Sequence, residues 1–311
     1  MKLKIGRYQI ELKSLNNNYN PKSLSYSDIK KVNDSNLNYL TSLSLAEIKE
    51  RIDSVSVTDL NTTENCAYAK KLLKEQGIFI VPNFLNKEIS ESLGKEVKKS
   101  FSNIDNLIDN VQGYYENDNL VIQMDEIRFK SYKKLASYSK PIVTVRQGQD
   151  QGMIDIFNFD KLPIIKNMQI KTHINQTGLN DIIKESSENT LSLSNINVYR
   201  NIGITQTRGF HMDDLSNTIK GFIYLSDVES LDDGPYCYCK GTHLQGAFRK
   251  TNQVLSSKAP NKTETPLVPM DSISPILAKK GSLVVSNQTG FHRGIPQKET
   301  AERLLLVMRY M

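Results

Sequence analysis

Hydrophobic residues follow a helical pattern early in the chain and a strand pattern in its last third. Apolar residues recur at helical spacing from Glu64 to Gln76, and Gly77 follows directly. The short apolar run Ile78–Val81 is typical of a strand. Asn86 is suited to cap a helix, and apolar residues four apart predict that helix from Lys87 to about Ser100.

The last third consists of short β-type runs separated by turn-rich segments. Strands are predicted at Ile196–Tyr199, Ile219–Leu225, Tyr236–Cys239, Gly281–Ser286 and Leu304–Tyr310. The middle, residues 102–186, is mixed and contains two further strand-like runs, Pro141–Arg146 and Gly152–Phe157. Helices first and strands afterwards predict a mainly β fold, a jelly-roll core with flanking helices.

Residues 1–63 are polar and Asn-rich, so we expect an N-terminal arm or helical extension on a main domain of residues 64–311. Charged residues make up 24% of the chain and hydrophobic ones 38%, as in a globular protein. The net charge is +6, but lysines and arginines are mixed with acids, which argues against nucleic-acid binding and slightly favours an anionic small molecule.

Three cysteines, Cys66, Cys237 and Cys239, are too few for a disulfide scaffold and fit a reducing compartment. No apolar run approaches the roughly 20 residues of a membrane span. We therefore expect a cytoplasmic protein that acts on a small molecule, without membrane or nucleic-acid partners.

His211-Met212-Asp213 carries the most specific chemical signal. In an extended segment, side chains two apart project to the same face, so this imidazole and this carboxylate could bind one metal ion. A distant histidine would complete a two-histidine, one-carboxylate triad, the set used by non-haem Fe(II) oxygenases. In isolation, the same pair could be an ordinary hydrogen-bonded surface pair.

Two histidines could be the distal ligand, and the residues after each one separate them. His292 is followed by a turn and a strand that begins near Arg303, whose planar guanidinium suits a carboxylate of 2-oxoglutarate. After His243 the nearest arginine is Arg249, in a polar loop without a strand, so we expect His243 to be structural. Arg309 shares the strand parity of Arg303 and is the alternative cation.

These motifs resemble the phytanoyl-CoA dioxygenase (PhyH) family of Fe(II)/2-oxoglutarate oxygenases. The resemblance rests on His211-x-Asp213, His292 and Arg303, on Gly77-Ile-Phe-Ile-Val-Pro-Asn-Phe-Leu-Asn-Lys-Glu88, and on Asp233-Gly-Pro-Tyr-Cys-Tyr-Cys-Lys-Gly-Thr-His243. In the last stretch, Lys240 and Thr242 replace a family proline and serine. The similarity runs from about Cys66 to Met311, with a weakly matching middle.

The resemblance implies a double-stranded β-helix with Fe(II) bound at one mouth by His211, Asp213 and His292. It further implies 2-oxoglutarate and O2 as co-substrates, Arg303 on the far carboxylate and Tyr199 as a hydrogen-bonding group. The expected reaction is hydroxylation or desaturation of an unactivated C–H bond, with release of succinate and CO2. Related halogenases have a small residue at the position of Asp213, so its presence indicates an oxygenase of the non-halogenating kind.

The substrate is the least determined part of the prediction. Arg146, before a glycine-containing polar segment, could bind an acidic group or belong to an ordinary surface turn. Arg208, three residues before His211, could face substrate or solvent. Two alternatives keep the fold: a jelly-roll protein that binds an acidic ligand without catalysis, and a zinc metallohydrolase using the same triad.

Overall fold

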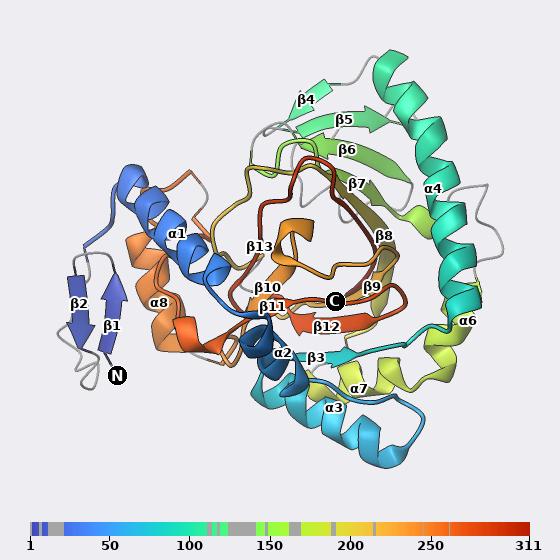
Figure 1. The fold of residues 1–311 in the computed structure, drawn as a ribbon, viewed down its shortest axis with the longest axis horizontal. Helices are drawn as coiled ribbons and strands as arrows, with labels where there is room; N and C mark the ends of the chain where they lie inside the picture. Colours follow the sequence, from blue (N-terminus) through green and yellow to red (C-terminus); the bar gives the residue numbers. More distant parts are fainter. Residues whose placement is uncertain are drawn as a thin grey trace.

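The fold is seen in a computed structural model of the chain (Figure 1). The structure describes residues 2–5, 8–11, 22–110, 114–116, 119–123, 141–146, 149–161, 169–187, 191–213, 216–244, 246–260 and 262–311. A large sheet and a small sheet face one another, and helices surround them. The helices are α1 (Tyr26–Thr41), α2 (Leu45–Asp53), α3 (Thr63–Glu75), α4 (Lys87–Asn110), α6 (Gln169–Gln176), α7 (Leu179–Ser186) and α8 (Gly246–Leu255).

The large sheet contains nine antiparallel strands in the order β3-β12-β9-β14-β8-β7-β6-β5-β4. Their bounds are β3 (Ile78–Val81), β4 (Tyr114–Glu116), β5 (Asn119–Gln123), β6 (Ile142–Arg146), β7 (Ile154–Phe157), β8 (Leu193–Ile202), β9 (Ile219–Tyr224), β12 (Leu283–Asn287) and β14 (Glu302–Tyr310). A separate hairpin near the N-terminus pairs β1 (Lys2–Ile5) with β2 (Tyr8–Glu11).

The small sheet has the order β11-β10-β13, with β10 (Tyr236–Cys239), β11 (Ile273–Ile276) and β13 (His292–Gly294). His211 extends this sheet through antiparallel bridges to His292 and to Glu264. From β8 onward the chain therefore alternates between the sheets: β8, residue 211, β9, β10 with β11, β12, β13 and β14. This alternation of two packed antiparallel sheets is the jelly-roll arrangement, and it confirms the predicted fold class.

The two faces of the large sheet differ because side chains alternate along each strand. One face carries Ile196, Val198, Ile223 and Leu306, which belong to a buried apolar cluster with Leu72 and Leu73 of α3 and Ile183 of α7. The opposite face looks toward the small sheet, as the contact of the Phe222 and Tyr236 rings shows, with centroids 5.2 Å apart. The helices thus cover the outside of the jelly roll, and its inner face carries apolar rings such as Phe222 together with polar residues.

Local sequence signals set several element ends. Asn86 accepts the Ile89 N–H at 2.8 Å, so the predicted cap of α4 is confirmed, although α4 continues beyond the predicted end at Ser100. Gly77 has a φ of 76° and lies against the Tyr238 hydroxyl and the His243 ring. A Cβ there would clash with both side chains, so glycine is required where α3 turns into β3.

One prediction of local structure was wrong. The segment around Arg249 was expected to be a polar loop, but it forms α8, whose Phe248 and Leu255 pack into a second apolar cluster with Leu40 and Ile48. Phe248 and Leu255 are the residues of this short helix that belong to the cluster, so its apolar pattern is easily hidden among polar residues.

The segment before α3 packs on the main body. The backbone of Val57 donates to Ile80 at 2.7 Å, and Ile80 donates to Val55 at 2.9 Å, which extends the edge of the large sheet beside β3. Arg51 of α2 donates to the Ile273 carbonyl at 2.7 Å.

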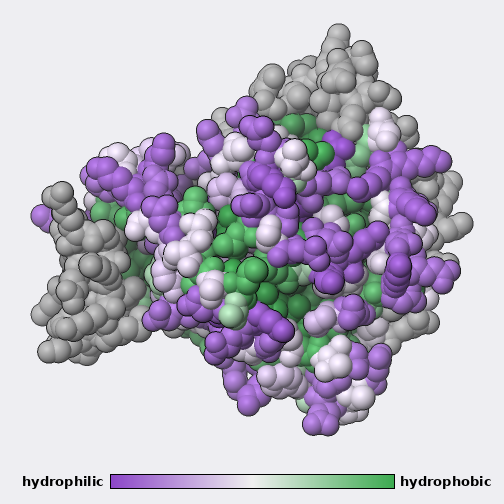
Figure 2. Space-filling model, viewed as in Figure 1, coloured by the Kyte–Doolittle hydropathy of each residue, from purple (hydrophilic) through white to green (hydrophobic). Residues whose placement is uncertain are grey.

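Within the part of the chain that the structure describes, no helix is both long enough and apolar enough to cross a membrane. The face of the molecule in Figure 2 is mainly hydrophilic at its rim, and apolar residues gather near its middle, over β10 and β11 of Figure 1.

Candidate metal centre

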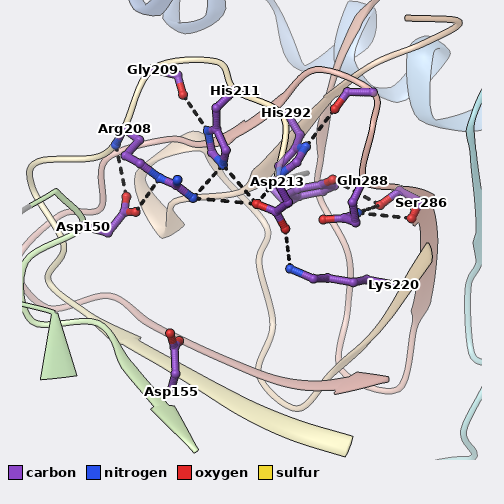
Figure 3. A network of polar contacts seen from close by, with 12 residues as sticks. Asp150, Asp155, Arg208, Gly209, His211, Asp213, Lys220, Ser286, Gln288 and His292 are labelled. Atoms are coloured by element: carbon purple, nitrogen blue, oxygen red, sulfur yellow. Dashed lines mark hydrogen bonds and ion pairs between the residues drawn. The ribbon is translucent and has the colours of Figure 1, made fainter. Parts of the chain in front are cut away.

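His211, Asp213 and His292 converge at one point inside the jelly roll (Figure 3). Their ligand atoms all lie within 4.8 Å of one another. Asp213 Oδ1 is 3.6 Å from His211 Nε2 and 3.4 Å from His292 Nε2. The sequence prediction that these three residues form one cluster, with His292 as its distal member, agrees with this geometry.

The backbone brings the two histidines side by side. His211 N–H donates to the His292 carbonyl at 3.0 Å, and His292 N–H donates to the His211 carbonyl at 3.0 Å. Residues that exchange both hydrogen bonds lie directly opposite each other, with their side chains on the same face. The two imidazole centroids are accordingly 4.5 Å apart.

Both imidazoles are oriented in the same way by their own loops. His211 Nδ1 lies 2.9 Å from the Gly209 carbonyl, and His292 Nδ1 lies 2.9 Å from the Gly290 carbonyl. Because a carbonyl only accepts, Nδ1 carries a proton in each ring, and Nε2 is the nitrogen that faces the cluster. Burial, with Arg208 and His292 nearby, holds the pKa of His211 well below its usual value, which favours the neutral form that binds metals.

Asp213 is held from two sides. Its N–H donates to the Gln288 carbonyl at 3.2 Å, and its Oδ2 lies 2.5 Å from Lys220 Nζ. Burial raises the pKa of the carboxyl, but Lys220, His292 and His211 together hold it well below its usual value. Burial lowers the pKa of Lys220, yet the nearby Asp213 carboxylate and Tyr199 leave it above its usual value. The pair is therefore ionised.

A chain of alternating charges lies beside the cluster. Arg208 Nη2 is 2.7 Å from His211 Nε2, and Arg208 Nε forms an ion pair with Asp150 at 3.3 Å. Arg146 pairs with Asp150 at 3.0 Å and with Asp155 at 3.1 Å. Asp150 thus joins the two arginines that the sequence suggested as substrate residues, and both already contact carboxylates.

The loop that carries these charges is tied together by its backbone as well. Asp150 has a φ of 58°, its N–H donates to the Gln206 carbonyl at 3.1 Å, and its carboxylate accepts the Arg208 N–H at 3.1 Å. Gln147 and Gly148, in the glycine-containing polar segment that follows Arg146, lie outside the described residues. Arg146 itself is the last residue of β6.

Glu264 is a further acid at this site. It lies opposite His211 in the small sheet and exposes only 2% of its surface. Burial raises the pKa of its carboxyl, while Gln149 and Arg208 act in the opposite direction.

Arg303 lies on the inner face of β14, near the strand of the small sheet that carries His292. Its Nη1 donates to the Gly234 carbonyl, and its Nη2 would be 3.7 Å from a Cβ placed on Gly294. Gly294 is two residues after His292 on β13, so the absent side chain leaves room for the guanidinium beside the cluster. Burial lowers the pKa of Arg303, with Tyr224 and Asp150 opposing this shift.

Arg309 also faces inward, as the parity argument predicts. It pairs in register with Lys220, whose side chain reaches Asp213. Tyr199 shares the same inner face: it is opposite Leu305 in β14, and Lys220 Nζ lies 5.9 Å from its ring centre. Arg303 and Tyr199 therefore flank the cluster from two neighbouring strands.

His243 is placed apart from this cluster. Its Nε2 is 3.0 Å from the Lys74 carbonyl, and its ring packs against Gly77, which agrees with the structural role expected for it. The two cysteines of β10, Cys237 and Cys239, are buried and free, and burial raises the pKa of Cys237 to about 12.

Sequence reasoning missed Lys220, Asp150 and Glu264. A signal for Lys220 was present, because a single lysine interrupts the otherwise continuous apolar run of β9. For the other two, the partners lie 58 and 53 residues away in the chain, which no local pattern records.

The donor set matches a metal ion that accepts nitrogen and oxygen. Two imidazoles and one carboxylate, gathered on one side of a point, form the facial arrangement that leaves neighbouring coordination positions for other ligands. The hydrogen bonds that orient all three side chains are the outer contacts typical of metal ligands.

No known protein-family model matches the chain, and no curated protein matches it. Solved structures similar to it include EvdO2 from Micromonospora carbonacea var. aurantiaca, with a TM-score of 0.49 and 14% identity over 78% of this chain and 89% of that one. The non-heme alpha ketoglutarate dependent carbocyclase SnoK from nogalamycin biosynthesis has a TM-score of 0.48 and 14% identity over 82% and 86%. HygX from Streptomyces hygroscopicus, with nickel, 2-oxoglutarate and hygromycin B bound, has a TM-score of 0.44 and 12% identity over 77% and 84%.

Proposed function

We propose that this protein is an Fe(II)- and 2-oxoglutarate-dependent oxygenase that hydroxylates or desaturates an unactivated C–H bond of a small molecule. The observation that carries the proposal is the convergence of His211 Nε2, His292 Nε2 and an Asp213 oxygen within 4.8 Å, with both imidazoles oriented by backbone carbonyls. Among first-row metals, two histidines and one carboxylate on one face are the ligand set of non-haem Fe(II) oxygenases.

In this proposal His211, Asp213 and His292 hold the iron. Arg303, buried beside the cluster, binds the far carboxylate of 2-oxoglutarate through its planar guanidinium, and Tyr199 donates a hydrogen bond to the same co-substrate. When bound, Fe(II) and 2-oxoglutarate together supply the activation of O2, with decarboxylation of the co-substrate to succinate and CO2.

The remaining inner-face residues orient the reactants and exclude water. Phe222 and Tyr236 pack against each other near the cluster, and the centroid of the Tyr236 ring lies 5.6 Å from that of the His292 ring. Water exclusion strengthens the electrostatic contacts inside the site. An anionic substrate stays a prediction, because Arg146 and Arg208 are both engaged with carboxylates.

The decisive experiment measures succinate formed from 2-oxoglutarate in the presence of Fe(II) and O2, with His211→Ala as the test variant. We expect the variant to lose iron-dependent turnover. His243→Ala is the matched control. His243 forms a hydrogen bond with the Lys74 carbonyl, apart from the cluster, so this substitution should leave turnover unchanged. Full turnover in His211→Ala would contradict the metal assignment.

Anaerobic titration distinguishes the two alternatives. Fe(II) and 2-oxoglutarate bound together should give a weak visible charge-transfer band. A ligand-binding protein would bind 2-oxoglutarate without forming succinate. A zinc metallohydrolase would show hydrolytic activity that is indifferent to O2.

A further inference from the structure

Lys220 is a charged residue on the inner face of the large sheet, where Arg309 of β14 is its neighbour in register. It lies on β9 between Ile219 and Gly221, and its side chain exposes only 15% of its surface. The strand alternation directs it to the inner face, and its Nζ ends 2.5 Å from Asp213 Oδ2.

The two oxygens of Asp213 have different partners. Oδ1 faces both imidazole nitrogens, at 3.6 Å and 3.4 Å, whereas Oδ2 faces Lys220. A rotation of the carboxylate that brought both oxygens toward the histidines would break the contact with the ammonium group. Lys220 therefore holds one of the two equivalent oxygens away from the cluster.

We propose that Lys220 is a positioning residue that restricts Asp213 to one-oxygen coordination and makes tight metal binding depend on the co-substrate. This inference rests on the proposed function. It adds a residue that the sequence resemblance does not include, and it concerns the order and coupling of ligand binding.

The electrostatic reasoning gives the sign of each effect. A cation paired with a ligating carboxylate reduces the negative charge offered to a metal dication and also repels that dication. The same cation attracts dianionic 2-oxoglutarate. Metal alone should therefore bind weakly, and metal with 2-oxoglutarate should bind much more tightly. By linkage, each ligand raises the affinity for the other by the same factor.

A merely structural role for Lys220 predicts the opposite result. If the lysine only supported the fold of the site, its removal would disturb Asp213 and weaken metal binding, as the loss of an outer contact commonly does by about 10–100-fold. If it acts as proposed, removal frees the second carboxylate oxygen and removes a repelling charge. Binding of metal alone then becomes tighter.

The test measures the dissociation constant of Co(II), first alone and then with saturating 2-oxoglutarate, for the parent chain and for Lys220→Met. We expect Lys220→Met to bind Co(II) alone about tenfold more tightly, the scale expected for partly buried charges a few ångströms apart. The factor by which 2-oxoglutarate raises Co(II) affinity should fall by about tenfold or more in the variant.

Two further variants complete the design. Lys220→Gln keeps a hydrogen-bond donor without the charge, and it should also lose coupling between Co(II) and 2-oxoglutarate, which covers the case in which Lys220→Met fails to fold. Lys240→Met is the control. Lys240 donates a hydrogen bond to Ser54 at 2.9 Å, away from the cluster, so this substitution should leave the Co(II) dissociation constant unchanged, both without and with 2-oxoglutarate.

The outcomes separate this inference from the proposed function. Failure of the parent chain to bind Co(II) even with saturating 2-oxoglutarate would overturn both. Normal Co(II) binding by the parent, with equal or weaker Co(II) binding and unchanged coupling in the Lys220 variants, would overturn the role of Lys220 alone.

Discussion

The ion pair between Asp213 and Lys220 should contribute measurably to the stability of the metal-free protein. The test is a double-mutant cycle with Asp213→Asn, Lys220→Met and the double variant, all in the presence of a chelator. Asparagine preserves the shape of aspartate, and methionine preserves most of the length of lysine. The cycle therefore isolates the charge interaction between the two side chains.

The size of the coupling follows from burial. Removing one partner of a fully buried ion pair costs about 3–5 kcal/mol. The side chains of Lys220 and Asp213 expose 15% and 25% of their surface, so water screens part of the attraction. We expect Asp213→Asn to cost about 2 kcal/mol, because it leaves the ammonium group without its carboxylate.

Lys220→Met should cost less, about 1 kcal/mol, because His211, His292 and the more distant Arg208 still surround Asp213. The double variant should lose about 1 kcal/mol, which leaves a coupling of about 2 kcal/mol. Urea unfolding followed by circular dichroism measures all four stabilities. If the two single losses add to the double loss within about 0.5 kcal/mol, the ion pair does not form and the reasoning is refuted.

Three other predictions address the surroundings of the cluster. Gly294→Ala should be tolerated, because the added Cβ would lie 3.7 Å from Arg303. Gly294→Leu should displace the guanidinium group and raise the KM for 2-oxoglutarate about tenfold or more. Equal KM values for both variants would contradict the position of Arg303. The lowered pKa of His211 means that the unfolded chain takes up a proton that the folded one does not, so stability should fall as pH drops below about 6.5. In His211→Asn, the pH slope of the unfolding free energy between pH 6 and 5 should be smaller by up to about 1.4 kcal/mol per unit, and an unchanged slope would count against a neutral buried imidazole. Asp150→Asn removes the carboxylate that forms an ion pair with Arg208. The variant should have a changed KM for the substrate, whereas its affinity for Co(II) should stay within about twofold of the parent value. A large loss of Co(II) binding would place Asp150 in the metal site instead.

Much of the fold was readable from local patterns. The strands of the jelly roll have alternating or continuous apolar runs, and Gly77 and Asn86 mark element ends where a left-handed turn and a helix cap are needed. The helix α8 was missed because few of its apolar residues face the core. Its stability comes from tertiary packing into the apolar cluster that also contains Leu40 and Ile48, and the local sequence does not record this packing.

For the candidate site, the chain itself determined the identity of the three cluster residues. The two-residue spacing of His211 and Asp213 places both on one face, and the strand after His292 carries Arg303 at its start. Parity along a strand is a local property, so it is available without knowledge of the fold. Parity also predicted that Arg303 and Arg309 face the same way, but not which of them lies beside the cluster.

Tertiary structure alone decided the partners of these residues. The large sheet brings β9 between β12 and β14, so that Lys220 reaches Asp213, and the loop after β6 brings Asp150 to Arg208 across 58 residues of chain. The space that a side chain at Gly294 would fill lies beside Arg303, because β13 and β14 belong to facing sheets. Such contacts depend on strand order, register and the packing of two sheets. These are non-local properties, whereas the alternation that assigns a residue to one face of a strand is determined by its immediate neighbours in the sequence.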